Sequence, residues 1–263
     1  MEFINEFLRN QGDSASANYG LMGTLGQCFG VVVAVFYLIR MKTKWLDWIK
    51  AVAMIFIGFF FCIYAYHLFT WYHTGFALDA YYQVSNLAIS FTALPLVAWL
   101  CAKAFNTSVG FAGDVITLFM LGFHTFGRSG CVFSGCCYGF ACDWGIYSRY
   151  TGGNQFPVCI VESLFTLGIL VFVFLRICRK GYAPDGKNLL WFLLLYGICR
   201  FFSEFTREST YDYWLFGRFS DVHIHMLVMA AVGGFLLWRI VKKERASEVG
   251  EEVSLPTVKG VRK

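Results

Sequence analysis

Long apolar runs, separated by short polar segments, fill most of the chain. With their flanks, these runs approach the ~20 residues that cross a bilayer as an α-helix. The pattern predicts seven membrane spans, at roughly 19–41, 48–70, 84–104, 108–126, 157–178, 187–207 and 221–241. The third, fourth and sixth spans are interrupted by unfavourable residues, which are Pro95, Asp114 and the pair Arg200 and Glu204.

Composition agrees with this pattern. Only 15% of the residues are charged, against about 25% in a typical soluble domain, and the mean hydropathy is +0.56. We therefore expect an all-α polytopic membrane protein with an external N-terminal segment at 1–18, a transmembrane domain at 19–241 and a flexible charged tail at 242–263. No signal peptide is expected, since the first twenty residues lack an apolar core.

Basic residues indicate the orientation. Lys and Arg gather after the first span, between the fifth and sixth spans and in the tail, whereas residues 71–85 contain none. By the positive-inside rule, the tail is then cytoplasmic and the N-terminus lies outside. The segment "GRSGCVFSGCCYG", residues 127–139, falls near the outer end of the fourth span. The same bias explains the net charge of +5, so nucleic acid is not an expected partner.

Three ionisable residues of the sixth span form one stripe. Arg200, Glu204 and Arg207 recur at spacings of four and three, which places them on one helix face. Charged residues inside a membrane are expensive and face the bundle interior. Two interpretations stay open: an ion-pair network that holds helices together, or an anion site that suits the planar fork of arginine. Arg218 is a further candidate for such a site.

Other polar residues extend this region. His124 and Arg128 lie on consecutive turns at the end of the fourth span, and Glu162 lies one turn into the fifth. The glycines of residues 127–139 permit close backbone approach, or a helix break that lines a cavity. A broken helix also presents free N–H groups to an anion. Together these residues predict a pocket for a phospholipid headgroup.

Four motifs in order carry a family resemblance. The segment "GRSGCVFSGCCYG" is similar to the signature G-R-x-G-N-x-x-N-G-E-x-[YW]-G, and it is accompanied by "NYGLMGTLG", "PVCIVE" and "YGICRFFSEFTR". On these motifs the chain resembles the bacterial prolipoprotein diacylglyceryl transferases from residue 19 to about 240. These enzymes move the diacylglyceryl group of phosphatidylglycerol to the lipobox cysteine of a preprolipoprotein and release glycerol phosphate.

The resemblance implies roles for individual residues. Arg128 and Arg200 clamp the lipid phosphate with the help of Arg207, and Glu204 and Glu162 hold these arginines in place. Tyr19 hydrogen-bonds the phosphate or the glycerol. The glycines of the signature line the lipid-binding site, and they are Gly127, Gly130 and Gly135. No cofactor and no metal ion are expected, and the site is expected to face the outer leaflet of a bacterial plasma membrane.

Several positions depart from the family pattern. Cys131 and Cys136 replace the signature asparagine and glutamate, Cys159 replaces a glutamine, and Thr92 replaces a histidine. The acceptor can therefore differ from a lipoprotein, or the chain can bind phospholipid without catalysis. His124 is the remaining candidate for the general base, because only an imidazole titrates near neutrality unaided. Its rivals are His223 and His225.

Four cysteines cluster in and after the signature, namely Cys131, Cys136, Cys137 and Cys142. Their C-x4-C-C-x4-C spacing differs from common zinc sites, although a four-ligand metal site that includes His124 is conceivable. A disulfide on an oxidising outer face, for example between Cys136 and Cys142, a reactive thiol at Cys136 or a thiol–disulfide function are the alternatives. The scatter of the other cysteines through the spans favours small polarizable residues that pack closely spaced helices.

Overall fold

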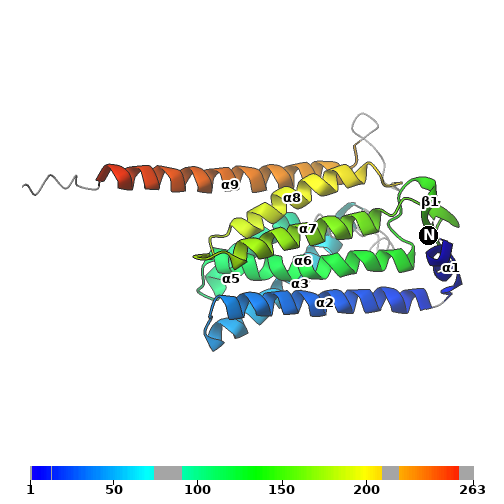
Figure 1. Ribbon diagram of the computed structural model, residues 1–263, viewed down its shortest axis with the longest axis horizontal. Coiled ribbons are helices and arrows are strands. Elements are labelled where there is room, and N and C mark those ends of the chain that lie inside the picture. The colour runs from blue at the N-terminus through cyan, green and yellow to red at the C-terminus, as the bar shows by residue number, and fades with distance from the viewer. Residues whose placement is uncertain (1, 13, 74–90, 209–218, 255–263) are drawn as a thin grey trace, which may run out of the picture.

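A computed structural model describes residues 2–12, 14–73, 91–208 and 219–254 of the 263. The described chain is mostly helical (Figure 1). Its elements are α1 (Glu2–Asn10), α2 (Ser14–Arg40), α3 (Trp45–His73), the 3-10 helix η2 (Phe91–Ala93), α5 (Leu94–Ala104), α6 (Val109–Ser134), β1 (Ala141–Ser148), β2 (Gly153–Gln155), α7 (Val158–Cys178), α8 (Lys187–Glu204) and α9 (Asp221–Ser254).

Five of the described helices are long and apolar enough to cross a membrane. They are Ser14–Arg40, Trp45–Cys62, Val109–Ser134, Val158–Cys178 and Val222–Ala246. Of two further predicted spans, 84–104 and 187–207, the structure shows α5, with only 11 residues, and α8, which carries Arg200 and Glu204. Residues 84–90 of the first lie outside the described residues, and the count of seven spans stays a prediction. The chain is therefore a multi-pass helical membrane protein, as the apolar runs indicate.

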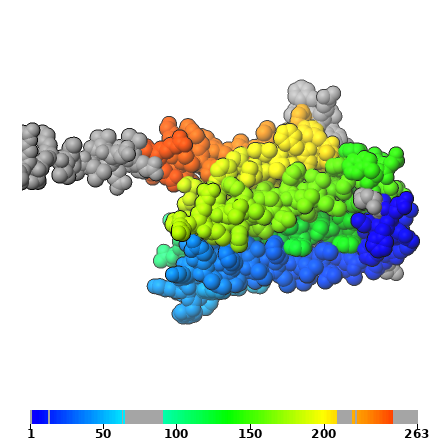
Figure 2. All heavy atoms as spheres, in the orientation of Figure 1, coloured from blue at the N-terminus to red at the C-terminus, as the bar shows by residue number. Residues whose placement is uncertain are grey.

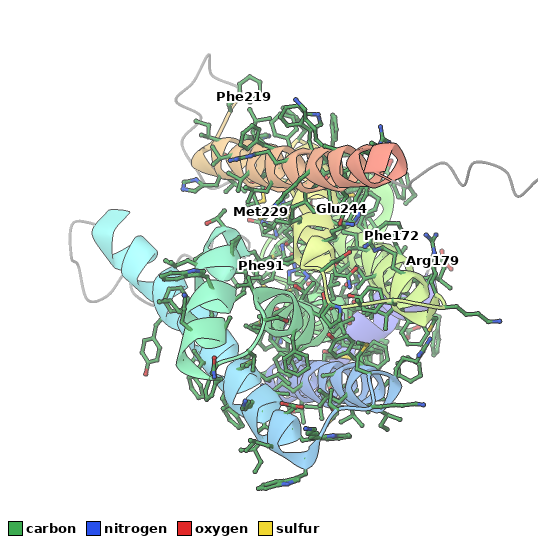
Figure 3. All side chains as sticks on the ribbon, turned by 90° about the vertical axis from the view of Figure 1, so that its left-hand side faces the viewer. Phe91, Phe172, Arg179, Phe219, Met229 and Glu244 are labelled. Carbon is green, nitrogen blue, oxygen red and sulfur yellow. The ribbon has the colours of Figure 1, made fainter. Side chains whose placement is uncertain are left out.

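Helix α6 is the centre of the bundle. Every residue from Gly110 to Gly122 is buried, and Figure 1 shows α6 between α2 and α7. Figure 3, turned by 90°, shows α9 on the opposite side of the bundle from α2. The buried position explains how α6 carries Asp114, whose carboxylate accepts hydrogen bonds from Tyr37, Tyr182 and Asn188.

Glycines allow α2 to approach α6 closely. A Cβ atom built on Gly122 of α6 comes within 2.6 Å of the Cα atom of Gly30 in α2. A Cβ atom on Gly26 comes within 2.5 Å of the Phe123 carbonyl oxygen. Close backbone contact through small residues is a common way of packing helices in membranes, where lipid offers no hydrophobic driving force between them.

Helix boundaries differ from the prediction at several points. Helix α2 begins at Ser14, α6 continues through the signature segment to Ser134, and α9 continues past residue 241 to Ser254. The expected helix break among the signature glycines is wrong for Gly127 and Gly130, which lie within α6. The helix ends only at Gly135, whose φ of 71° is the left-handed cap that glycine adopts without steric cost.

A short two-stranded antiparallel sheet follows the signature in the otherwise helical chain. Strands β1 and β2 pair between α6 and α7, and α1 packs against β1. The Asn5 side chain donates to the Gly145 carbonyl and accepts from the Tyr147 amide. Figure 2 shows the blue surface of α1 against the green surface at this end of the molecule. The hairpin and α1 thus cover the end of α6 that carries the signature.

Candidate functional site

Glu162 is the centre of a buried ion network that joins three helices. It lies in the first turns of α7 and is 2% exposed. Arg128 of α6 contacts Oε2 of Glu162 through both Nε and Nη2. Arg200 of α8 places Nη1 3.0 Å from Oε1, and the Ser203 hydroxyl lies 3.3 Å from the same oxygen. One carboxylate therefore fixes the two arginines that the sequence assigns to an anion clamp.

The rest of the charged stripe joins the network from α8. Arg200 Nη1 lies 2.5 Å from Glu204 Oε2, one turn further along the helix. Arg207, just after α8, places Nε 3.7 Å from Glu162 Oε1. Three guanidinium cations thus face two carboxylates, so that the network carries one surplus positive charge. The ion pairs join α6, α7 and α8, as the first of the two interpretations expects, while the anion site stays a prediction.

Several arginine donors make no hydrogen bond to any described residue. They are Nε and Nη2 of Arg200 and Nε and Nη2 of Arg207. An unpaired buried donor costs free energy comparable to its desolvation, about 1–3 kcal/mol, and more for a charged group. An anion placed between these guanidinium groups removes that cost. Arg128, with 15% of its side chain exposed, is the most open of the three arginines.

Backbone pairing holds the chain after the signature against the end of α8. Gly139 and Arg207 form an isolated antiparallel bridge, and the Phe140 amide donates to the Thr206 carbonyl at 3.1 Å. Residues 127–139 and the end of the stripe at Arg207 therefore lie side by side.

The signature glycines and Tyr19 lie along the contact between α2 and α6. A Cβ atom on Gly130 comes within 3.0 Å of the Met22 Cβ atom and 3.3 Å of the Tyr19 ring. Tyr19 is 46% exposed, so its side chain lies at the edge of the bundle beside the signature. Gly127 has only the Phe123 ring, at 3.7 Å, near its Cβ position. A larger side chain would therefore meet close neighbours at Gly130 but not at Gly127.

His124 lies deep in the bundle with both ring nitrogens engaged. Thr166 Oγ1 donates to the Glu162 carbonyl at 2.8 Å and therefore accepts from His124 Nδ1, 3.3 Å away. Neutral His124 then carries its proton on Nδ1, and Nε2 accepts from the Tyr196 hydroxyl at 3.2 Å. Thr166 and Tyr196 are partners that the sequence analysis missed, although Thr166 lies one turn after Glu162 on the same helix.

The rival histidines occupy a different environment. The His223 ring lies against Phe201, Phe205 and Phe219. Its Nδ1 accepts from the Ser220 amide at 3.1 Å. His225 follows one turn into α9. Arg218, the further candidate for the anion site, lies outside the described residues.

Cysteines converge beside Arg128, but the set differs from the one expected. Cys136 and Cys142 are both unbridged thiols, so the suggested disulfide between them is absent from the structure. The sulfur atoms of Cys131, Cys136 and Cys137 lie within 4.8 Å of one another. Cys159 of α7 joins them, whereas Cys142 lies on β1. Sequence spacing favoured Cys142, because only the fold brings the start of α7 against the end of α6.

Known proteins resemble this chain along most of its length. The sequence model of the prolipoprotein diacylglyceryl transferase family matches residues 8–239. Phosphatidylglycerol–prolipoprotein diacylglyceryl transferase 2 from Clostridium perfringens is 30% identical to this chain over 135 residues, which are 48% of this chain and 50% of that protein. One from Dehalococcoides mccartyi is 26% identical over 57% of this chain and 60% of its own length.

The coverage of the relatives differs. The chain spans about half the length of the Clostridium perfringens relative that it matches. A phosphatidylglycerol–prolipoprotein diacylglyceryl transferase from Clostridioides difficile is 25% identical over 241 residues, which are 89% of this chain and 94% of that protein. Similarity therefore extends through the helices that carry Arg128, Glu162 and Arg200.

Proposed function

Because the chain belongs to the prolipoprotein diacylglyceryl transferase family, we propose that it transfers the diacylglyceryl group of phosphatidylglycerol to a cysteine thiol of a prolipoprotein. The observation that carries this proposal is the buried network of Arg128, Glu162 and Arg200, with its surplus positive charge and unpaired arginine donors. Such a network suits the phosphate diester of the donor lipid, because preorganised guanidinium groups bind phosphate oxygens strongly.

The reaction makes and breaks one bond at a glyceryl carbon. The acceptor sulfur forms a bond to this carbon, the bond from the carbon to the phosphate oxygen breaks, and glycerol phosphate leaves with the electron pair. Arg128, Arg200 and Arg207 stabilise the charge that develops on the departing phosphate. Glu162 and Glu204 position these arginines, and Tyr19 at the edge of the site hydrogen-bonds the phosphate or the glycerol. Gly127, Gly130 and Gly135 shape the wall beside the lipid.

His124 is the proposed acceptor of the thiol proton. Its Nε2 lies 3.2 Å from the Tyr196 hydroxyl, so the proton reaches the imidazole through Tyr196: the hydroxyl gives its proton to Nε2 and takes one from the thiol. General base catalysis of this kind contributes on the order of 10²–10⁴-fold to a rate. His124 gains its positive charge next to Thr166, whose hydroxyl oxygen accepts a hydrogen bond from Nδ1–H.

The surroundings of the site support a location in a bacterial plasma membrane. In the proposed arrangement of seven spans with the N-terminus outside, Arg128 lies near the outer leaflet, where an exported acceptor arrives. Basic side chains gather at the other end of the bundle around a hollow of about 770 Å³ between α7, α8 and α9. They are Arg176, Arg179, Lys180, Lys187, Lys242 and Arg245. This end suits the cytoplasmic face with its anionic lipids.

A second candidate function follows from the cysteines. Cys131, Cys136 and Cys159 stand where the family motifs carry amide or carboxylate side chains, so the surroundings of the acceptor are changed while the arginines are kept. A transferase with a different acceptor, or a phospholipid-binding protein without catalysis, has the same clamp. Unlike the first function, neither of these transfers a diacylglyceryl group to a lipobox peptide.

The transfer is tested with purified protein in micelles that contain phosphatidylglycerol and a synthetic lipobox peptide. Mass spectrometry measures a diacylglyceryl adduct on the peptide cysteine. We expect an adduct with the native chain, its loss with Arg128→Ala, and its retention with Arg239→Ala, which removes an arginine from α9 outside the network. Lipid that stays bound without any adduct contradicts the proposed transfer and favours the second candidate function.

The proton path is tested by His124→Ala and Tyr196→Phe in the same assay. Both changes remove the route to Nε2, so we expect transfer to fall on the order of 10²–10⁴-fold while phosphatidylglycerol stays bound. Tyr150→Phe is the matched control, because Tyr150 is 72% exposed. If His124→Ala retains activity that Arg128→Ala abolishes, His124 is not the base, and His223→Ala and His225→Ala become the next variants.

A further inference from the structure

Four thiols meet at the junction of α6 and α7. Cys131 lies in the last turn of α6, Cys136 and Cys137 lie in the turn that follows, and Cys159 lies in the first turn of α7. The first three sulfur atoms are within 4.8 Å of one another. Cys159 Sγ donates to the Cys137 carbonyl oxygen at 3.0 Å. Cysteines from the two helices and from the turn between them therefore meet at this junction.

A small cavity lies among these side chains. It has a volume of about 20 Å³, and all four cysteines line it. A space of roughly 10–15 Å³ suffices for a water molecule, and a dehydrated transition-metal ion is smaller. Packing alone does not account for this arrangement, because cysteines that only fill gaps have no reason to converge on one point. The other cysteines of the chain lie apart from this cavity.

Neighbouring donors favour negative charge on the cluster. Arg128 Nη1 lies 3.3 Å from Cys137 Sγ and 3.9 Å from Cys131 Sγ. The Ser134 hydroxyl donates to Cys136 Sγ at 2.9 Å. Because the thiolate is the form that binds metals, these contacts prepare a metal ligand.

We propose that Cys131, Cys136, Cys137 and Cys159 bind one thiophilic metal ion, either Zn²⁺ on four thiolates or Cu⁺ on three. Thiolates are the ligands that both ions prefer. Zinc–sulfur bonds of about 2.3 Å require sulfur atoms about 3.8 Å apart, so the first three ligands need to move by only about 1 Å. Each thiol that joins the ion releases its proton to solvent, and no redox step is involved.

The unusual spacing of the ligands does not argue against this site. The C-x4-C-C-x4-C pattern of the sequence ends at Cys142, which lies on β1 outside the cluster, whereas the fourth cysteine of the cluster is Cys159. Helices α6 and α7 supply ligands that are far apart in sequence, and the turn between them supplies an adjacent pair. Cys137 adopts a φ of 58°, an uncommon conformation for a residue other than glycine. This conformation directs two consecutive side chains toward the same cavity.

Metal binding is measured on the purified full chain in detergent, after removal of metal and reduction of all thiols. Elemental analysis counts bound Zn²⁺ after dialysis, and a chromophoric chelator competes for Cu⁺. We expect one ion per chain. Cys137→Ser removes both ions, whereas Cys159→Ser weakens Zn²⁺ at least about 100-fold and leaves Cu⁺ bound if three thiolates hold it. Cys142→Ser, the matched control, binds both ions as the native chain does.

A second measurement needs no variant. Zn²⁺ or Cu⁺ is added to the native chain before brief alkylation, and mass spectrometry maps the modified cysteines. Protection of the four ligands relative to Cys142, together with thiolate-to-metal charge transfer in a Co²⁺-loaded sample, supports the site. Equal binding by the native chain and Cys137→Ser overturns the proposal. So does a fully reduced native chain that binds neither ion, whether or not it transfers lipid.

Discussion

Glu162 determines the charge balance of the anion site. It contacts Arg128, Arg200 and Arg207 at once and is almost completely buried. Neither an arginine nor a glutamate is tolerated at this depth alone, because an unpaired buried charge is strongly destabilising. The three arginines are thus held close enough for one phosphate by a single carboxylate, and their mutual repulsion is relieved by it.

Replacement of this carboxylate gives a sharp prediction. Glu162→Gln leaves Arg128 and Arg207 without their ion-pair partner, so we expect the free energy of unfolding to fall by about 3–5 kcal/mol. Glu244→Gln is the control, because Glu244 pairs with Lys187 on an exposed surface and such pairs contribute about 0–1 kcal/mol. Thermal unfolding in detergent measures both variants. A Glu162→Gln melting temperature equal to that of Glu244→Gln contradicts the proposed role.

At the scale of elements, the contact between α2 and α6 fixes the position of the signature. Gly30 and Gly122 bring the two backbones together, and Gly130 lies further along the same contact, next to Tyr19. Gly122→Ala introduces a methyl group 2.6 Å from the Gly30 Cα atom. We therefore expect a lower melting temperature and a weaker lipid adduct, because the helices and the Tyr19 side chain must move apart from Arg128.

Gly168→Ala in α7 is the matched control for this change. Nothing lies within 4 Å of a Cβ atom built there, and alanine in a helix is more favourable than glycine by about 0.5–1 kcal/mol. We expect this variant to melt at the same temperature or slightly higher. If Gly122→Ala behaves like Gly168→Ala, the close approach of α2 and α6 is not what positions the signature.

The sequence predicts these elements unequally. Apolar runs locate the helices. The spacing of Arg200, Glu204 and Arg207 predicts one charged helix face, and in the structure this face lies beside Glu162. The hairpin at β1 and β2 escaped prediction, since its short strands carry no apolar run. Thr166, Ser203 and Cys159 also escaped, because small polar side chains inside a helix gain their role only from the neighbours that packing supplies.

At the scale of the whole molecule, the two ends of the bundle differ in chemistry. The end formed by the signature, α1 and the hairpin carries the ion network and the four thiols. The opposite end carries the basic side chains of α7, α8 and α9, with Arg179 and Glu244 marked in Figure 3. By the positive-inside rule we expect the basic end to be cytoplasmic, and the proposed anion site to face the outer leaflet.

Native cysteines report this orientation without any engineered label. Cys142 lies on β1 at the signature end, and Cys178 is exposed at the end of α7. A membrane-impermeant maleimide applied to intact cells is expected to modify Cys142 and to spare Cys178, and mass spectrometry of the recovered chain separates the two sites. Permeabilised cells are the control, in which Cys178 is also modified. Labelling of Cys178 but not Cys142 in intact cells reverses the orientation, and the anion site then faces the cytoplasm, where an acceptor that has crossed the membrane is out of reach.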